Sequence, residues 1–152
     1  MSAFGVAVDE ECVCIFEAGV AKDAALDRLV TATARASGVA DTASIEQAVR
    51  GREASQSTAI GGGVAIPHAY TEAVTRPCIG VGISRAGLAL AGTEPGLVHV
   101  VVFFLMPASA NRQYLELLAQ LMVAMKAPTF LNRLAACEAP AEVIAILNES
   151  GG

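Results

Sequence analysis

The sequence has few basic residues and no cluster of them. Ten lysines and arginines stand against fifteen aspartates and glutamates, which gives a net charge of −5. Proteins that bind nucleic-acid phosphates need a basic patch, so this deficit argues against a nucleic-acid partner. The first basic residue is Lys22, and the N-terminus therefore lacks the basic start of a secretory signal. This mildly acidic composition suits a soluble cytoplasmic protein.

The sequence also lacks a hydrophobic run long enough to cross a membrane. Its longest mostly apolar run, Leu97 to Met106, contains His99 and has about half the length of a membrane-spanning helix. Hydrophobic residues make up 54% of the chain and charged residues 16%, as in compact globular proteins. With no internal repeat, linker or low-complexity segment, we expect one domain over residues 1–152, with no direct insertion into a membrane.

The cysteines do not have the spacing of a zinc site. Cys12 and Cys14 should share one face of a strand, but this C-x-C has no second pair to complete a tetrahedral set of ligands. Cys78 and Cys137 are isolated in the sequence. We therefore expect buried, reduced thiols, with neither a metal ion nor a cofactor.

The pattern of apolar residues predicts strands interspersed with helices. The expected strands are Cys12–Phe16, Val64–Ile66, Pro77–Ile83, a short edge strand at Leu88–Leu90, and Val98–Leu105. The expected helices are Lys22–Ser37, one capped by Asp41 or Thr42 that carries Arg50, Arg52 and Glu53, then Asn111–Lys126, Thr129–Cys137 and Pro140–Leu147. This order predicts an α/β fold, a three-layer sandwich with a mixed β-sheet flanked by helices.

Several residues have a predicted place in this fold. Val98–Leu105 is apolar almost throughout, which indicates a central strand covered on both faces. Gly38 should end the first helix, and Gly80 and Gly82 should allow close packing of the backbone. The inward-facing residues are expected to be Leu26, Leu29, Val30 and Thr33 in the first helix, Ile45, Ala48 and Val49 in the second, and Tyr114, Leu118, Leu121, Met122 and Met125 in the long helix.

The segment Ser57–Tyr70, S-T-A-I-G-G-G-V-A-I-P-H-A-Y, is the strongest candidate for a functional site. Glycines 61–63 let another group approach the backbone, and Pro67 should end the short strand just before His68. A neutral imidazole at pH 7 can act as a nucleophile or base. The alternatives are a structural histidine and a plain glycine turn, since G-G-G matches neither common phosphate-binding motif. A polar turn should follow His68.

These residues resemble a known family. Arg52-Glu53, Ser57-Thr58 and the string G-G-V-A-I-P-H ending at His68 are similar to the enzyme IIA domain of the fructose/mannitol type. That domain belongs to the bacterial phosphoenolpyruvate-dependent sugar phosphotransferase system, and the nitrogen-regulatory IIA proteins are close relatives. The resemblance extends over nearly the whole chain, including the Y-L-E-L-L-A-Q-L helix that begins at Tyr114.

The resemblance implies roles for individual residues. His68 would take a phosphoryl group from the carrier HPr through Nε2 and pass it to an enzyme IIB domain. Arg52 matches the family's site arginine, whose planar fork of donors suits phosphate oxygens. Ser57, Thr58 and backbone N–H groups near the glycines would complete the anion site. The alternatives are a solvated helix-end charge for Arg52 and a turn or cap for Ser57 and Thr58.

The sequence departs from the family at one position. The family usually carries a second histidine at the start of the long helix, in an H-L-x-x-L context, where this chain has Tyr114. A phenol can donate a hydrogen bond to a phosphoryl oxygen but cannot supply an imidazolium. His99 lies at the start of the central strand and does not fill that position, so we expect it to be structural.

Two functional hypotheses follow. In the first, neutral His68 attacks a phosphoryl group in line while Arg52 and backbone donors stabilise its oxygens, which requires no metal ion. In the second, the chain is a regulatory module that docks on partner proteins, with or without phosphorylation. A hydrolase is poorly supported, because no nucleophile elbow or metal-binding set is present.

Overall fold

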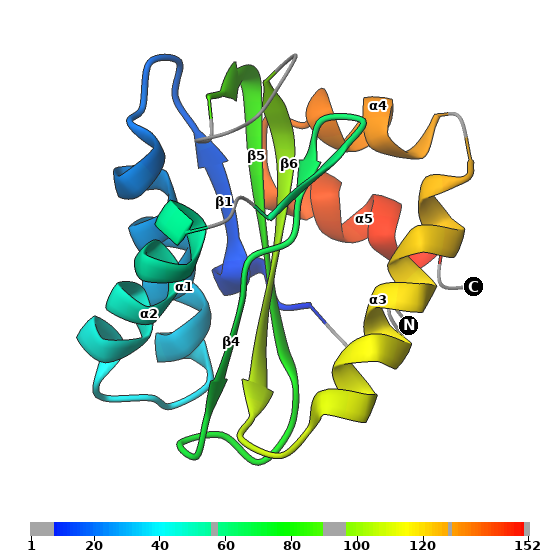
Figure 1. Cartoon of the computed structure of the whole chain (residues 1–152). Helices are drawn as coiled ribbons and strands as arrows, with labels where there is room; N and C mark the ends of the chain where they lie inside the picture. The colour runs from blue at the N-terminus through cyan, green and yellow to red at the C-terminus, as the bar shows by residue number, and fades with distance from the viewer. Residues whose placement is uncertain (1–7, 56–57, 90–96, 128, 151–152) are drawn as a thin grey trace.

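The computed structural model describes residues 8–55, 58–89, 97–127 and 129–150. These residues form a six-stranded mixed sheet with helices on both faces (Figure 1). The strand order is β1-β5-β6-β3-β2, and β4 pairs with β6. The predicted three-layer α/β sandwich is therefore confirmed.

In the described residues, a short 3-10 helix and one strand are followed by two helices, five consecutive strands and three final helices. Their bounds are η1 (a 3-10 helix, Glu10–Cys12), β1 (Val13–Phe16), α1 (Lys22–Ala36), α2 (Thr42–Ser55), β2 (Ala59–Gly61), β3 (Val64–Ala65), β4 (His68–Thr71), β5 (Cys78–Leu88), β6 (Val98–Pro107), α3 (Asn111–Met125), α4 (Phe130–Ala135) and α5 (Pro140–Ser150).

Strand β6 is the centre of the sheet. It pairs antiparallel with β5 on one side and parallel with β3 and β4 on the other, while β1 pairs parallel with β5. Every residue from Val100 to Met106 is buried. Alternate side chains enter two separate cores, with Phe104 and Met106 in one and Phe103 and Leu105 in the other. The prediction of a central strand covered on both faces is confirmed.

Helices α1 and α2 cover one face of the sheet (Figure 1). The four residues predicted to face inward from α1 are all buried: Leu26, Leu29, Val30 and Thr33. In α2, Ile45 and Val49 are buried as predicted, but Ala48 is exposed. Asp41 caps α2, because its Oδ1 accepts the Ser44 N–H at 3.2 Å.

Two glycines in β5 let α1 approach the sheet closely, as predicted. A Cβ on Gly80 would overlap the hydroxyl oxygen of Thr33, and a Cβ on Gly82 would lie 2.6 Å from the Phe16 ring. At Gly38 the backbone adopts φ +84°, and α1 ends two residues before it.

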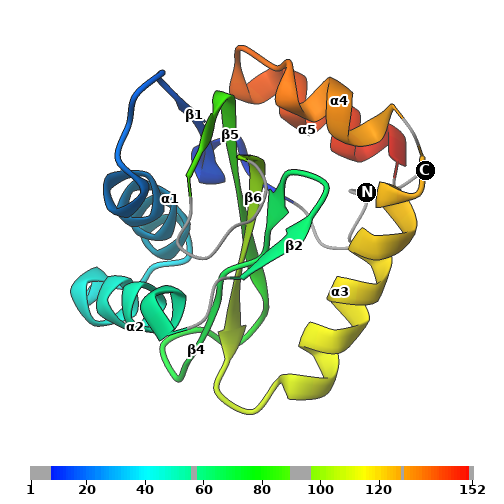
Figure 2. The same ribbon diagram turned by 45° about the horizontal axis from the view of Figure 1, so that its top comes forward.

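Helices α3, α4 and α5 cover the opposite face, as Figure 2 shows from a second direction. In α3, Tyr114, Leu117 and Leu121 are buried, so Leu117 was missed by the prediction. Met122 is 38% exposed and was wrongly placed inside. Met122 lies about 80° around the helix from Tyr114, toward solvent, at about 100° per residue.

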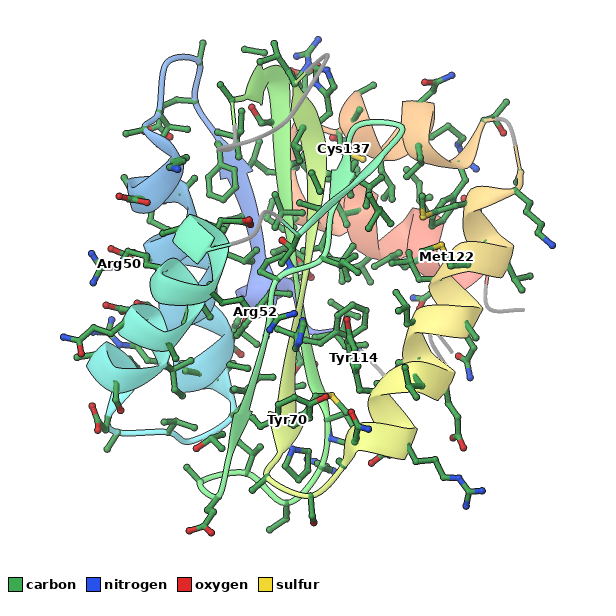
Figure 3. All side chains as sticks on the ribbon, in the orientation of Figure 1. Arg50, Arg52, Tyr70, Tyr114, Met122 and Cys137 are labelled. Carbon is green, nitrogen blue, oxygen red and sulfur yellow. The ribbon has the colours of Figure 1, made fainter. Side chains whose placement is uncertain are left out.

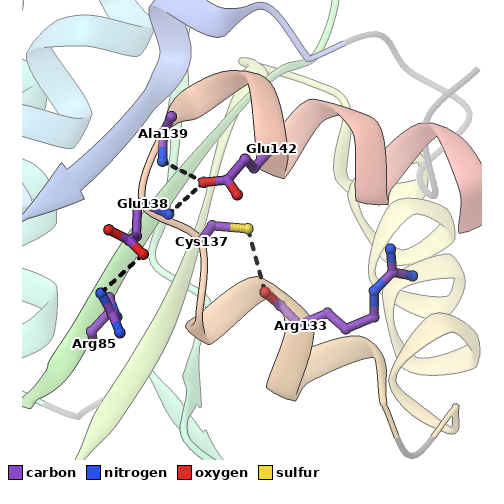
Figure 4. Close-up of polar contacts among 6 residues, drawn as sticks. All are labelled: Arg85, Arg133, Cys137, Glu138, Ala139 and Glu142. Carbon is purple, nitrogen blue, oxygen red and sulfur yellow. Dashed lines mark hydrogen bonds and ion pairs between the residues drawn. The ribbon is translucent and has the colours of Figure 1, made fainter.

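The junction between α4 and α5 is held by the Glu142 carboxylate (Figure 4). Its Oε1 accepts the backbone N–H groups of Glu138 at 2.8 Å and Ala139 at 2.9 Å. These groups precede Pro140, the predicted first residue of the last helix. A first-turn carboxylate that binds back to amides just before the helix stabilises a helix N-terminus.

Two segments differ from the prediction. The polar turn expected after His68 is instead β4, which pairs with β6 from His68 to Thr71. Tyr and Thr favour extended backbone, and pairing with a buried central strand decides the conformation. Leu88 is the last residue of β5 rather than part of a separate edge strand, and Leu90 lies outside the described residues.

All four cysteines are free thiols, and Cys12 and Cys137 are buried. Cys14 and Cys78 are only half-buried, so the expectation of burial was wrong for these two. Cys12 belongs to η1, so the expectation that it shares a strand face with Cys14 was wrong. Burial raises the pKa of Cys12 to about 12. The described part of the chain contains no group of three His, Cys, Asp or Glu side chains arranged to hold a metal ion. In the same part, no helix has the length and apolar character needed to span a membrane.

Candidate functional site

His68 begins β4, immediately after the short strand β3 and the two residues Ile66 and Pro67. Both strands keep one register along β6, in which Val64 pairs with Val100 and His68 with Phe104. The Pro67 carbonyl accepts the Phe104 N–H at 3.1 Å, which continues the pairing across the interruption. The His68 side chain is half-buried, as expected for a histidine at the edge of a core element.

Tyr114 lies directly against His68. The two rings stack with centroids 4.6 Å apart and an angle of 27° between their planes. The other neighbours of Tyr114 include Phe104, whose ring meets it edge-on at 5.4 Å. Tyr114 is buried in the first turn of α3, so the core holds it in place beside the imidazole. The predicted position of Tyr114, at the helix start and facing the core, is confirmed.

The Ile66 carbonyl favours the tautomer of His68 that carries its proton on Nδ1. Nδ1 of His68 lies 3.5 Å from the Ile66 carbonyl oxygen, a long hydrogen bond in which Nδ1–H is the donor. That arrangement leaves the lone pair on Nε2. The sequence did not reveal this acceptor, because a carbonyl two residues earlier has no signature in residue type.

The surroundings keep His68 neutral. Burial lowers the pKa of His68, the hydrogen bond to Ile66 opposes that change, and the positive charge of Arg52 lowers the pKa further. Burial raises the pKa of Tyr114, and Tyr70 adds to the increase while Arg52 opposes it. At neutral pH the site therefore combines a neutral imidazole, a neutral phenol and a cation.

Arg52 is an exposed side chain in the last turn of α2. Figure 3 shows it directed from α2 toward β4 and Tyr114, while Arg50 points away from the site. Arg50 instead faces α1, where its Nε lies 3.4 Å from Asp27 Oδ1. Of the two arginines that the sequence places before the glycine segment, Arg52 is the one at His68.

Thr58 is bound to Glu53 rather than free. Its N–H and its hydroxyl each donate to a different oxygen of the buried Glu53 carboxylate, both at 2.7 Å. Both donors of Thr58 are thus occupied in this structure. Ser57, the other predicted phosphate-binding residue of this pair, lies outside the described residues.

The glycine turn lies away from His68. Gly62 and Gly63 both have positive φ, 65° and 81°, and form the turn between β2 and β3. The Gly63 carbonyl accepts the His99 N–H at 2.8 Å, near the start of β6. His68 pairs with Phe104, five residues further along β6, or about 16 Å at ~3.3 Å per residue. The backbone N–H groups of this turn therefore do not surround His68.

His99 has a structural environment, as predicted. Its Nδ1 lies 2.9 Å from the Ser84 carbonyl oxygen, and its ring packs beside Gly63 and Gly87 at the far end of β6 from His68. It does not supply the second imidazole that the family usually places beside its active histidine.

Tyr70 and Asn111 also lie at this site, and neither was predicted from the sequence. Tyr70 is two residues after His68 on extended backbone, so both side chains lie on the same face of β4. A strand prediction at 68–71 would have identified this neighbour, whereas the predicted turn concealed it. Asn111 is the first residue of α3 and receives a hydrogen bond from the Tyr70 hydroxyl at 3.1 Å, a contact that no local pattern indicates.

Comparison with known proteins gives the family. Residues 7–150 match the model of the phosphoenolpyruvate-dependent sugar phosphotransferase system, EIIA 2. The chain belongs to this family. The resemblance predicted from the segment around His68 is thereby confirmed.

The family includes relatives of different length. The chain is 30% identical over 128 residues to the fructose-specific EIIABC component of Bacillus subtilis, a match that covers 84% of this chain and 20% of that protein. It is 27% identical to the fructose-specific EIIA component of Haloferax volcanii, covering 73% and 72% of the two chains. It is 29% identical over 106 residues to a nitrogen regulatory protein of Klebsiella oxytoca, covering 69% and 65%.

Solved structures share the fold. The nitrogen regulatory protein IIA-Ntr of Neisseria meningitidis superposes with a TM-score of 0.79 at 24% identity, covering 92% of this chain and 95% of that one. IIA mannitol of Escherichia coli superposes with a TM-score of 0.76 at 19% identity, covering 93% and 99%. The Escherichia coli enzyme IIA in a complex with phosphorylated enzyme IIB, both mannitol-specific, gives 0.77 at 18% identity, covering 93% and 97%.

Proposed function

We propose that this chain is a histidine phosphocarrier of the phosphotransferase system, with His68 as the residue that carries the phosphoryl group. One observation supports this most directly: Nδ1 of His68 lies against the Ile66 carbonyl, an acceptor that favours a proton on Nδ1 and a lone pair on Nε2. A lowered pKa keeps that nitrogen unprotonated at neutral pH. An unprotonated ring nitrogen held in a fixed orientation is what an attacking nucleophile requires.

In the proposed transfer, one bond forms and one bond breaks. Nε2 of His68 attacks the phosphorus of a phosphohistidine on an HPr-like carrier, and the phosphorus–nitrogen bond to that carrier breaks. The electron pair of the broken bond returns to the carrier's ring. For a donor ring that carries its own N–H, each ring keeps its proton and the phosphoryl group alone moves. The reverse chemistry passes the group from His68 to an enzyme IIB.

Arg52 is the proposed phosphate-binding cation. Its guanidinium can donate two parallel hydrogen bonds to phosphoryl oxygens, and its charge already acts on His68. The Tyr114 hydroxyl is a second proposed donor, next to the imidazole. Thr58 can take part once its hydroxyl turns away from Glu53, and Ser57 remains a proposed donor from the sequence resemblance.

A regulatory role is the second candidate, and Tyr114 favours it. Where a second imidazole is replaced by a neutral phenol, a phosphoryl group on His68 lacks a cationic neighbour that would assist onward transfer. Phosphorylation would add about −1.5 to −2 charges beside Arg52 and alter docking on a partner. Both candidates treat residues 1–152 as one functional domain that acts in the cytoplasm.

Labelling tests the proposal. The chain is incubated with labelled phosphoenolpyruvate, enzyme I and HPr, and wild type is compared with His68→Ala and with His99→Ala, the matched loss of the other histidine. We expect acid-labile label on wild type and His99→Ala and none on His68→Ala. Label retained by a folded His68→Ala would overturn the assignment. Subsequent addition of an enzyme IIB separates the candidates, because loss of label to it indicates transport and retention indicates regulation.

A further inference from the structure

Tyr70 completes an aromatic cluster around His68. Its ring meets the imidazole edge-on, with centroids 5.9 Å apart and planes at 82°. It meets the Tyr114 ring in the same way, at 6.4 Å and 78°. Tyr114 therefore stacks on the face of the His68 ring. Tyr70, which belongs to the same strand as His68, meets both of these rings edge-on. Figure 3 shows Tyr70 and Tyr114 projecting toward each other between β4 and α3.

The Tyr70 hydroxyl connects β4 to α3. It donates a hydrogen bond of 3.1 Å to Oδ1 of Asn111, the first residue of that helix. The residue preceding the helix, Ala110, provides no side-chain cap. Tyr114 follows Asn111 by three residues, so the hydrogen bond and the ring that stacks on His68 belong to the same helical turn.

This link lies on the exposed side of the first turn of α3. Tyr114 packs on Phe104 and thereby attaches the helix to the core, whereas Asn111 and Arg112 are exposed. Tyr70 is itself 39% exposed, and its ring meets the rings of His68 and Tyr114 edge-on. The hydrogen bond limits how far the first turn of α3 can move away from β4, and with it the Tyr114 ring.

We propose that Tyr70 is a positioning residue: through Asn111 it holds the first turn of α3 so that Tyr114 remains stacked on His68. The effect of Tyr70 on phosphoryl transfer rests on the proposed function. Its effect on the position of Tyr114 concerns the unphosphorylated protein and can be tested separately. Tyr70 does not react. It restricts the orientation of the imidazole whose Nε2 must line up with the incoming phosphorus.

The proposal predicts matching effects of two different substitutions. Tyr70→Phe keeps the ring and removes only the hydroxyl, and Asn111→Ala removes only the acceptor. Each should change the NMR signals of the His68 ring protons, because the ring current of Tyr114 shifts with its position. The double variant should show no larger change than either single one, since both remove the same bond. Asn148→Ala, an exposed asparagine of α5, is the matched control.

The chain provides an internal reference for this measurement. It has only two histidines, and His99 lies at the other end of β6 against Ser84. The ring signals of His99 should stay in place in every variant. Unchanged His68 signals in both single variants, or equal changes at His99, would overturn the proposal.

Labelling through enzyme I and HPr measures the functional part. We expect Tyr70→Phe and Asn111→Ala to slow labelling about three- to tenfold, the effect of one neutral hydrogen bond, with Asn148→Ala unchanged. Variants that move the His68 signals but label at the wild-type rate would exclude a positioning role. Wild-type protein that takes no label would instead reject the proposed function, while the NMR comparison still decides whether Tyr70 holds Tyr114 in place.

Discussion

Glu53 holds Thr58 with both oxygens of its carboxylate. Oε2 accepts the Thr58 N–H and Oε1 accepts its hydroxyl, each at 2.7 Å. Glu53 is 3% exposed, near the end of α2, and Thr58 directly precedes β2. The pair joins the helix that carries Arg52 to the strand that leads toward His68. This buried carboxylate therefore helps to position Arg52 and the segment that leads to His68.

Removal of that carboxylate should destabilise the fold. In Glu53→Ala, the partly buried Thr58 N–H and hydroxyl lose their acceptors, and we expect a loss of about 1–3 kcal/mol in the free energy of unfolding. Urea unfolding measures the loss. Glu149→Ala, which removes an exposed carboxylate paired with Arg133, is the control and should have a smaller effect, because solvent screens an exposed ion pair. Equal losses in the two variants would show that the Glu53–Thr58 pair is not stabilising.

The pKa of His68 should lie below the usual value of about 6.5. Burial and the charge of Arg52 both favour the neutral ring. Because the unfolded chain then binds the proton more readily, the contribution of His68 to stability is present above about pH 6.5 and is lost as pH falls toward the folded pKa. NMR titration of the ring protons measures this directly. A pKa above 6.5 would contradict the predicted direction.

Loss of Arg52 should act on both the rate and the pKa. Arg52→Gln removes the proposed phosphate-binding fork, and we expect labelling of His68 to slow about 10²-fold, as for the loss of one donor in an anion-stabilising site. The pKa of His68 should rise, because a nearby positive charge has gone. Arg50→Gln removes the same charge from the same helix, on the side that faces Asp27, and should leave both quantities unchanged.

Tyr114 should limit onward transfer. Tyr114→His places a second imidazole next to His68, and we expect release of the phosphoryl group to an enzyme IIB to speed up about tenfold or more. Tyr114→Phe keeps the stacked ring but removes the hydroxyl, so it separates the effect of stacking on the transfer rate from the effect of hydrogen bonding. Single-turnover transfer from labelled protein gives the rate. If Tyr114→His transfers no faster than wild type, the phenol is not what limits this step.

Gly80 should not tolerate a side chain. In Gly80→Ala the methyl group would overlap the Thr33 hydroxyl and lie 3.0 Å from Leu29, so α1 must shift from the sheet. We expect a loss of about 1–3 kcal/mol, typical of overpacking. Gly51→Ala, in α2 with no atom within 4 Å of the new methyl, should stabilise by about 0.5–1 kcal/mol. Thermal unfolding measures the stability of both variants. A Gly80→Ala variant as stable as wild type would show that α1 can move away from the sheet at little cost.

Local patterns were sufficient for most of the fold. The apolar run of β6 predicted a strand buried on both faces, because a strand covered on both faces is apolar at nearly every position. The spacing in α1 predicted its buried side correctly. The predictions were wrong where packing against neighbouring elements decided which side chains are buried. Met122 lies at the margin of the apolar stripe of α3, and only the packing of that helix on β6 determined that Leu117 rather than Met122 is covered.

The sequence by itself determined which residue type could carry the chemistry and which family the chain resembles, since these depend on the order Arg52, Glu53 and G-G-V-A-I-P-H. Tertiary structure alone decided the surroundings of His68. Tyr114 stacks on it from 46 residues away, and Asn111 receives the Tyr70 hydroxyl from 41 residues away. Contacts of this kind depend on how a helix packs on a sheet, so no periodicity within either segment encodes them. The separation of the glycine turn from His68 has the same origin, because the register along β6 places them at different positions on one strand.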